Sequence, residues 1–482
     1  MLKRNVVLKN TVLKYTVIKH KVKRMAFLWI FFITATCLSS VSYGDAYPTL
    51  PRDGDKYLSD GDLPARTPPI VELGASFLGT GNIEPGFVLP TGAVWSPALW
   101  VYGNFRTAYQ RYRPSEGAGG EVAEWVNRLD LFANLQLTGT ERILLGLTPL
   151  HDRDKGEFYG KIYEPDSLEE NNTETNAKID TLFFEGDFAE LFPNIDYFDS
   201  TKNDIGFSIG RQQMLFMDGF LINDSMDGIG LSKNNMRFSA YPWLINWRST
   251  IFVGIDDIDR HTNEDIDNSK LVAWFNQLDS ARSTYNVDVV YVDGDEAGDV
   301  LNFGGEAIQR IGKINTAFRV AISQATSAVT EQSDNGVLLF VEVSWVPSRS
   351  HNNVYVNGFI GIDNFTSAAR GPLEGGPLGR AGILFAAQGI GSLPAPISNS
   401  AQKTSGFTLG YQRFFGPRRQ IVVEVGGRLE HRIHFKNEQG VALRFQQAIG
   451  RRAFVQLDAY STWLEDEAKA EYGTRIELQI KL

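Results

Sequence analysis

Hydrophobic and polar residues alternate one by one along much of this chain, from about residue 98 to the end. In KINTAFRVAIS, residues 313–323, the even-numbered positions are mostly apolar, while the odd-numbered ones include Lys313 and Arg319. The closing stretch TRIELQIKL, residues 474–482, has the same pattern. Successive side chains of a strand point to opposite faces, so the alternation predicts strands with one apolar face and one charged face.

Runs of this kind predict about 18 strands, with 16 to 18 as the range. Their expected starts are residues 99, 125, 142, 178, 203, 227, 247, 271, 284, 300, 313, 337, 353, 405, 420, 441, 453 and 472. Helical periodicity is absent over any comparable length. Many runs have about 9 to 11 residues, the length that a tilted membrane strand needs, whereas strands of a soluble sandwich have about 5 to 6. The pattern therefore predicts an all-β, antiparallel transmembrane barrel.

The connections agree with a barrel in an outer membrane. Counted back from the C-terminus, every second connection is short, as in IGRR, FGPRR and IGK, and these are expected in the periplasm. Long segments, including 151–177, 256–270 and 364–404, fall on the outer side. An even number of strands follows, with both ends of the barrel in the periplasm.

The first 97 residues differ from the rest. Residues 1–44 hold eight basic residues and no acid, followed by an apolar run and small residues, which predicts a cleaved signal peptide that starts at Met1 or Met25. An uncleaved anchor is the alternative, although the apolar run is short for a spanning helix. Residues 45–97 contain eight of the 19 prolines and are expected to form a periplasmic leader or a small plug. The barrel is expected at 98–482.

Charge and cysteine content narrow the classes further. The full chain has a net charge of −10, and removing residues 1–44 lowers it to −18, which argues against a nucleic-acid partner. The single cysteine, Cys37, lies in the expected signal, so the mature chain would have no disulfide. We expect the location to be the bacterial outer membrane, with lipid and lipopolysaccharide around the barrel. The oligomeric state is left open.

Charges on the polar strand faces predict the lining of a pore. Nine cations are expected to face inward, against six acids, Asp130, Asp288, Glu342, Glu424, Asp458 and Glu477. The residues predicted to line the pore are Arg106, Arg128, Arg211, Arg248, Lys313, Arg319, Glu342, Arg428, Arg444 and Arg475. Arginines in a water-filled pore attract anions and bind carboxylate or phosphate in two-pronged contacts. Pairing of these arginines with acids, merely to stiffen the wall, is the alternative.

No pattern of catalytic residues stands out. The histidines His151, His261, His351, His431 and His434 are all expected in solvated loops or turns. No acidic loop has calcium-site spacing, and no cofactor or metal is expected. The chain is therefore not expected to be an enzyme.

The segment IGRQQMLFMDGFLINDSMDGIGLSKNN, residues 209–235, resembles the outer-membrane alginate-export family and related porins. The motif of that family would fall here on Gly210, Arg211, Gln212, Asp218, Gly219, Asp227 and Gly228. The resemblance implies an 18-stranded barrel with an arginine-lined conduit for an acidic polysaccharide, and Arg211 as a lumen cation. We therefore expect a channel for anionic solutes, either small molecules or a polysaccharide of the alginate type. A non-selective diffusion porin, a barrel enzyme and a structural surface protein are the alternatives.

Overall fold

A computed structural model describes residues 67–77, 86–114, 120–153, 155–164, 171–195, 204–266, 268–432, 435–465, 467 and 469–482. The predicted signal peptide at 1–44 lies outside the described residues, as does His434. No helix in the described part of the chain is long and apolar enough to cross a membrane.

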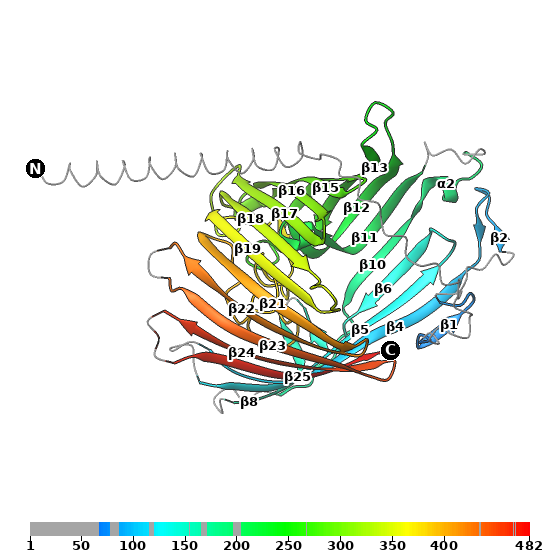
Figure 1. Ribbon diagram of the computed structural model, residues 1–482. Coiled ribbons are helices and arrows are strands. Elements are labelled where there is room, and N and C mark those ends of the chain that lie inside the picture. Colours follow the sequence, from blue (N-terminus) through cyan, green and yellow to red (C-terminus); the bar gives the residue numbers. More distant parts are fainter. Residues whose placement is uncertain are drawn as a thin grey trace, which may run out of the picture. The chain divides into compact units, whose positions relative to one another are not determined.

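The described residues form a closed antiparallel β-barrel of 18 strands (Figure 1). The wall consists of β4 (Ala98–Arg113), β5 (Val122–Gln136), β6 (Arg142–Leu147), β10 (Ile179–Asp187), β11 (Ile205–Phe216), β12 (Ile222–Met236), β13 (Leu244–Asp256), β14 (Lys270–Ser280), β15 (Ser283–Asp293), β16 (Val300–Ile311), β17 (Ile314–Ala325), β18 (Gly336–Trp345), β19 (Asn353–Asp363), β21 (Thr404–Gly416), β22 (Arg419–Glu430), β23 (Glu438–Ile449), β24 (Ala453–Leu464) and β25 (Glu471–Lys481). Each strand pairs with the next, and β25 pairs with β4 to close the ring. The predicted fold and strand number are confirmed.

Short elements supplement the wall. They are β1 (Val71–Leu73), β2 (Phe87–Val88), β3 (Val94–Trp95), β7 (His151–Asp152), β8 (Glu157–Glu164), β9 (Asn171–Asn172), β20 (Ala369–Arg370), helix α2 (Phe188–Leu191) and the 3₁₀ turns η2 (Met217–Gly219) and η3 (Asp295–Ala297). Two parts of the Pro-rich segment 45–97 contact the wall: β1 pairs with β4, and Phe77 stacks on Tyr102 of β4. The described part of this segment is therefore attached to the wall.

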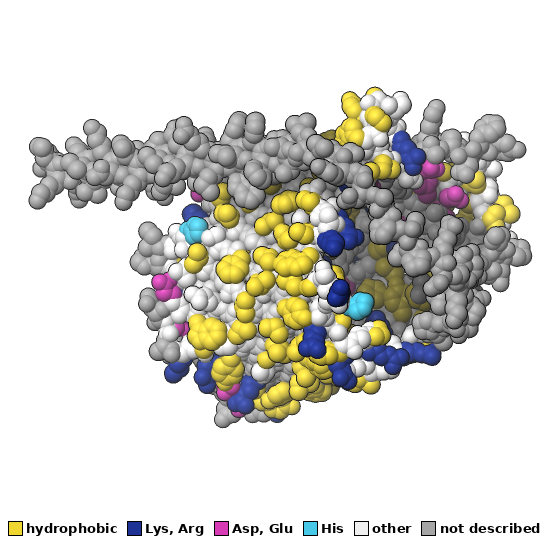
Figure 2. Space-filling model, viewed as in Figure 1, with side chains coloured by type: hydrophobic (Ala, Val, Ile, Leu, Met, Phe, Trp, Pro, Cys, Tyr) yellow, Lys and Arg dark blue, Asp and Glu magenta, His cyan; other side chains and the backbone are white. Residues whose placement is uncertain are grey.

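The outer surface of the wall is apolar, as the alternation predicts. Ile251, Trp274, Val287, Phe407 and Ile476 are all exposed, and Figure 2 shows hydrophobic side chains spread over the barrel surface. The residues that alternate with them along each strand face the inside of the ring. In β25, for example, Arg475 and Glu477 on either side of Ile476 are 3% and 0% exposed. Apolar side chains face lipid in such barrels, and polar ones face the lumen.

We predict that the two faces of β15 respond differently to a charge. Val287→Lys places an ammonium group on the apolar face, where a lysine costs about 2–4 kcal/mol near the middle of a bilayer. Asn286→Lys is the control, because Asn286 is the neighbouring residue on the lumen side and already bonds Glu306. Urea unfolding from lipid vesicles measures both. Equal losses of unfolding free energy in the two variants would contradict the assigned orientation.

Candidate functional site

The interior of the barrel is crossed by the long connection between β19 and β21, residues 364–403, which we call the lumen loop. Its Phe365, Leu378, Phe385 and Ile397 are fully buried and belong to one apolar cluster. Residues of the wall in the same cluster include Met226, Phe252, Leu271 and Val290. The loop thus forms a hydrophobic core within the barrel, a feature on which the alternating pattern of the strands gives no information.

Carboxylates of the wall hold the backbone of the lumen loop. Glu424 of β22 accepts hydrogen bonds from the N–H groups of Ile383 and Leu384, at 3.1 and 2.8 Å. Glu124 of β5 accepts from both the N–H and the hydroxyl of Ser392, each at 2.7 Å. Buried backbone N–H groups need partners, so these bonds satisfy a segment that has little secondary structure of its own.

Arginines of the wall hold the carbonyl groups of the same loop. Arg128 donates to the Gly389 oxygen at 2.8 Å, and Arg106 donates to the oxygens of Gly389 and Gln388 at 3.4 and 3.2 Å. Arg428 of β22 is buried and donates to the Ser398 oxygen at 2.6 Å. These arginines therefore position the loop in addition to lining the lumen.

Glycine is required where the loop meets these side chains. Gly382 has φ +86°, and a Cβ there would collide with the carboxylate of Glu424. Gly391 has φ +65°, and a Cβ there would collide with Gln110 and approach Glu124. The glycine-rich sequence of the loop thus permits both the left-handed backbone and the close approach of the wall.

The outer end of the lumen loop is anchored by a second set of contacts. Residues Ala369 and Arg370 form β20, which pairs in parallel with β12. The Ser367 N–H donates to Nδ1 of His261 at 3.0 Å, in the outer connection between β13 and β14. Burial, together with the neighbouring positive charges of Arg370 and Arg260, lowers the pKa of His261 to about 3. His261 was predicted to be solvated, as was His151, and both are buried.

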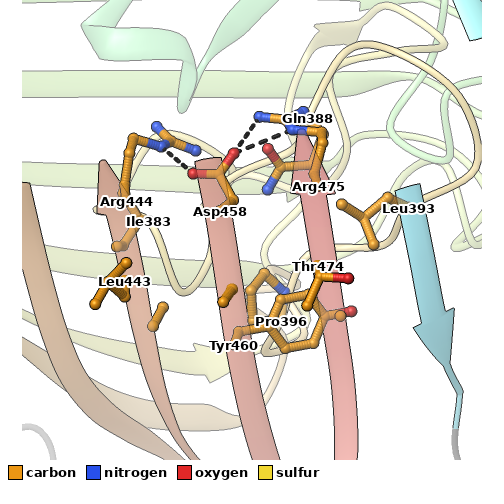
Figure 3. A pocket seen from close by; sticks show the side chains of 13 residues that line it. Ile383, Gln388, Leu393, Pro396, Leu443, Arg444, Asp458, Tyr460, Thr474 and Arg475 are labelled. Atoms are coloured by element: carbon orange, nitrogen blue, oxygen red, sulfur yellow. Dashed lines mark hydrogen bonds and ion pairs between the residues drawn. The ribbon is translucent and has the colours of Figure 1, made fainter. Parts of the chain in front are cut away.

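Four arginines lie together on the wall beside the lumen loop. They are Arg106, Arg128, Arg444 and Arg475, which we call the arginine cluster. Arg444 and Arg475 share Asp458, each at 2.6 Å, and Figure 3 shows them on either side of it. Arg106 and Arg475 share Glu477, at 2.6 and 3.4 Å, while Arg128 pairs with Asp130 at 3.0 Å. Four guanidinium groups therefore share three carboxylates.

Little space remains between the lumen loop and the wall at this cluster. The cavity lined by Gln388, Leu393 and Pro396 of the loop, together with Arg444 and Arg475, has a volume of about 10 Å³. That is room for about one water molecule. The side chains of Arg128 and Arg444 are nevertheless 23% and 21% exposed, so both reach solvent in part.

The remaining predicted residues have different surroundings. Arg319 faces inward, pairs with Glu306 and Glu342 at 2.5 and 3.2 Å, and lies over the rings of Phe220 and Phe340. Arg248 also faces inward. It lines a cavity of about 490 Å³ below η2.

Two predicted residues do not line the lumen. Arg211 lies on the outward face with Ile209 and pairs with Asp227 and Asp257, each at 3.0 Å. Position 211 has the same parity as the exposed Ile209, so the prediction was wrong because it rested on the motif resemblance and not on the alternation. Lys313 was placed on a strand, but it lies in the turn between β16 and β17.

The predicted excess of inward cations is not observed. Glu124, Glu306 and Glu438 also face inward, in addition to the six acids expected from sequence. Glu124 was missed although it has the same parity as Arg128 in β5. The interior therefore has no general excess of positive charge, and its arginines are concentrated beside the lumen loop.

Comparison with known proteins gives structural matches only. No family model matches the chain, and no curated protein does. Among solved structures, a BenF-like porin from Pseudomonas fluorescens Pf-5 matches with a TM-score of 0.55 at 10% identity, covering 82% of this chain and 100% of the porin. OccK5 (OpdH) of Pseudomonas aeruginosa matches with a TM-score of 0.52 at 11% identity, covering 80% of this chain and 98% of OccK5.

The fold is that of the outer-membrane porins. A third match is OccK2 (OpdF) of Pseudomonas aeruginosa in complex with glucuronate, with a TM-score of 0.51 at 11% identity, covering 82% of this chain and 99% of OccK2. The resemblance to porins is thus confirmed at the level of the fold. The resemblance to the alginate-export family finds no support in these comparisons.

We predict that Gly382→Val displaces the lumen loop and raises the single-channel conductance severalfold, because valine fits neither the φ of +86° nor the space beside Glu424. Gly305→Val is the control, since no atom lies within 4 Å of a Cβ at this position of β16. Recordings in planar bilayers measure both variants. An unchanged conductance in Gly382→Val would show that the loop does not restrict the lumen.

We also predict that acid weakens the outer anchor of the lumen loop. His261 is held neutral, so its contribution to docking is complete above its ordinary pKa of 6.5 and is lost as the pH falls toward 3. At pH 5 the loss is about 2 kcal/mol, or roughly 30-fold in an opening equilibrium. Hydrogen exchange of residues 366–371 at pH 7.5 and 5 measures it. His261→Gln, which retains an acceptor for the Ser367 N–H, should remove this part of the pH dependence; an unchanged dependence would contradict the assignment.

Proposed function

We propose that this protein is an outer-membrane channel through which small anionic solutes diffuse, past a constriction formed by the lumen loop. The observation that carries the proposal is the arginine cluster. Its four guanidinium groups share three carboxylates, and Arg128 and Arg444 reach solvent beside the loop. A local excess of positive charge in a narrow, low-dielectric passage raises the concentration of anions there.

The closed barrel and its apolar outer surface support an outer-membrane location, because both match what a lipid bilayer demands of a strand-built protein. OccK2, with which the chain shares its fold, binds glucuronate in one solved structure, and this supports a carboxylate as the solute. Channel activity also agrees with the expectation that the chain is not an enzyme. The signal peptide at 1–44 and the contacts with lipopolysaccharide stay predictions.

A small solute is better supported than an acidic polysaccharide of the alginate type. The lumen loop is joined to the wall at both ends and bonded to Glu424, Glu124, Arg106 and Arg128 between them. A polymer would have to pass this segment or displace it. Displacement would leave the buried backbone N–H groups of the loop without their partners.

A non-selective diffusion porin is the second candidate. The observation in its favour is that every arginine of the cluster already has a carboxylate partner. Paired charges attract solutes less than free ones do. The two candidates differ in the selectivity that they predict.

Reversal potentials in a tenfold KCl gradient separate them. The proposed function predicts preference for chloride, and the preference should fall roughly two- to threefold in Arg444→Gln and rise in Asp458→Asn. Gln412→Leu is a control, because Gln412 is an uncharged neighbour bonded to Gln420. Equal permeability for both ions, unchanged in all three variants, would favour the non-selective porin; cation preference would contradict both the cluster's role and the proposed solute class.

A further inference from the structure

The large cavity below η2, which we call the η2 cavity, has a lining unlike that of the arginine cluster. It is bounded by inward residues of β12 to β16 and by Phe216 to Asp218. Its volume of about 490 Å³ lies in the usual range for small-molecule sites, ~300–1,000 Å³. The cavity can therefore hold a whole small solute.

Hydrogen-bonding groups of both kinds line the η2 cavity. Gln277 and Asn286 supply amides, which both donate and accept, and Ser232 and Thr250 supply hydroxyls. Asp288 is 3% exposed, and among the described residues it accepts only one hydrogen bond, from the Asn276 N–H at 3.4 Å. A buried carboxyl with one long hydrogen bond retains acceptor capacity for a ligand.

The charges of the η2 cavity are mostly compensated. Glu306 pairs with Arg319 at 2.5 Å, and Asp218 pairs with Arg380 of the lumen loop at 3.0 Å. Arg248 lines the cavity and has no ion pair with any carboxylate that the structure describes. An ammonium group therefore finds few unpaired acids here, whereas a carboxylate finds Arg248, whose charge interacts with Asp279 only at longer range than an ion pair.

One wall of the η2 cavity is aromatic. The rings of Phe216 and Phe275 stack with their centroids 3.3 Å apart and an interplanar angle of 6°. Phe275 is buried behind, while Phe216 is only partly buried. An exposed ring face packs against the C–H face of a flat or ring-shaped solute.

We propose that the η2 cavity is a binding site for a hydroxyl-rich solute of monosaccharide size. Hydroxyl groups donate to Asp288 and exchange hydrogen bonds with the amides of Gln277 and Asn286, while Phe216 contacts the carbon skeleton. Arg248 binds the carboxylate of those solutes that carry one. This proposal rests on the proposed function, since the solute reaches the cavity through the lumen.

Four solutes of similar length test the chemistry. Gluconate, sorbitol, hexanoate and 6-aminohexanoate are added in turn to single channels in KCl, and the transient reduction of the ion current is titrated. Gluconate is expected to reduce the current at the lowest concentration, and sorbitol next. Hexanoate, which has the charge and chain length of gluconate without its hydroxyls, is expected to be at least tenfold weaker. The proposal would be overturned if hexanoate blocked the channel as strongly as gluconate, or if 6-aminohexanoate blocked it more strongly than sorbitol.

Variants locate the effect in the cavity. Asn286→Leu should weaken the block by sorbitol and by gluconate about tenfold. Arg248→Gln should weaken the block by gluconate to the level of sorbitol and leave the block by sorbitol unchanged. Gln412→Leu, an inward amide outside this cavity, is the matched control. Equal losses in Asn286→Leu and Gln412→Leu would place binding elsewhere. If Asn286→Leu fails to fold, the comparison of the four solutes on the unaltered channel still decides.

The test also separates the two proposals. If gluconate blocks the channel more strongly than hexanoate but the channel does not prefer chloride, the η2 site is supported and the proposed anion selectivity is contradicted. If the channel prefers chloride but gluconate and hexanoate block it equally, the proposed anion selectivity is supported and the η2 site is contradicted.

Discussion

Hydrogen bonds from the backbone of the lumen loop to charged side chains of the wall are the interactions on which the rest of the interior depends. An 18-strand ring is wide enough to enclose an aqueous channel. Glu424 and Glu124 accept N–H groups of the loop, and Arg106 and Arg128 donate to its carbonyls. Without such partners, burying this irregular segment would cost about 1–3 kcal/mol for each unsatisfied group. The wall thus stabilises the element that narrows it.

The same bonds decide what the charged residues can do. Carboxylates that hold the loop, such as Glu424, are occupied, and so is the buried Arg428. Arg128 and Arg444 combine an ion pair with partial exposure, so they are held in place and still face water. Charge for selectivity therefore comes from a few positioned groups and not from a uniformly cationic wall.

The sequence predicted the wall well and the interior poorly, for a physical reason. Alternation reports which side of a strand meets lipid, and it placed all 18 strands and the inward side of Arg475 and Glu477. It contains no information on a connection that packs inside the ring, so the apolar core around Phe365 and Phe385 was not predicted. Arg211 was misplaced where a motif was preferred to the parity of its strand. Glu124 could have been found by that parity, but its partner Ser392 could not, since 268 residues separate them.

The central claim is that the docked lumen loop sets the passage through the barrel. Ala108 of β4 and Ile390 of the loop lie in one buried apolar cluster, and the sequence has no cysteine after Cys37. The decisive measurement is the single-channel conductance of the Ala108→Cys, Ile390→Cys double variant before and after oxidation. Oxidation locks the docked loop to the wall, so the account predicts the same conductance in both states. A severalfold larger conductance in the reduced state would contradict the account.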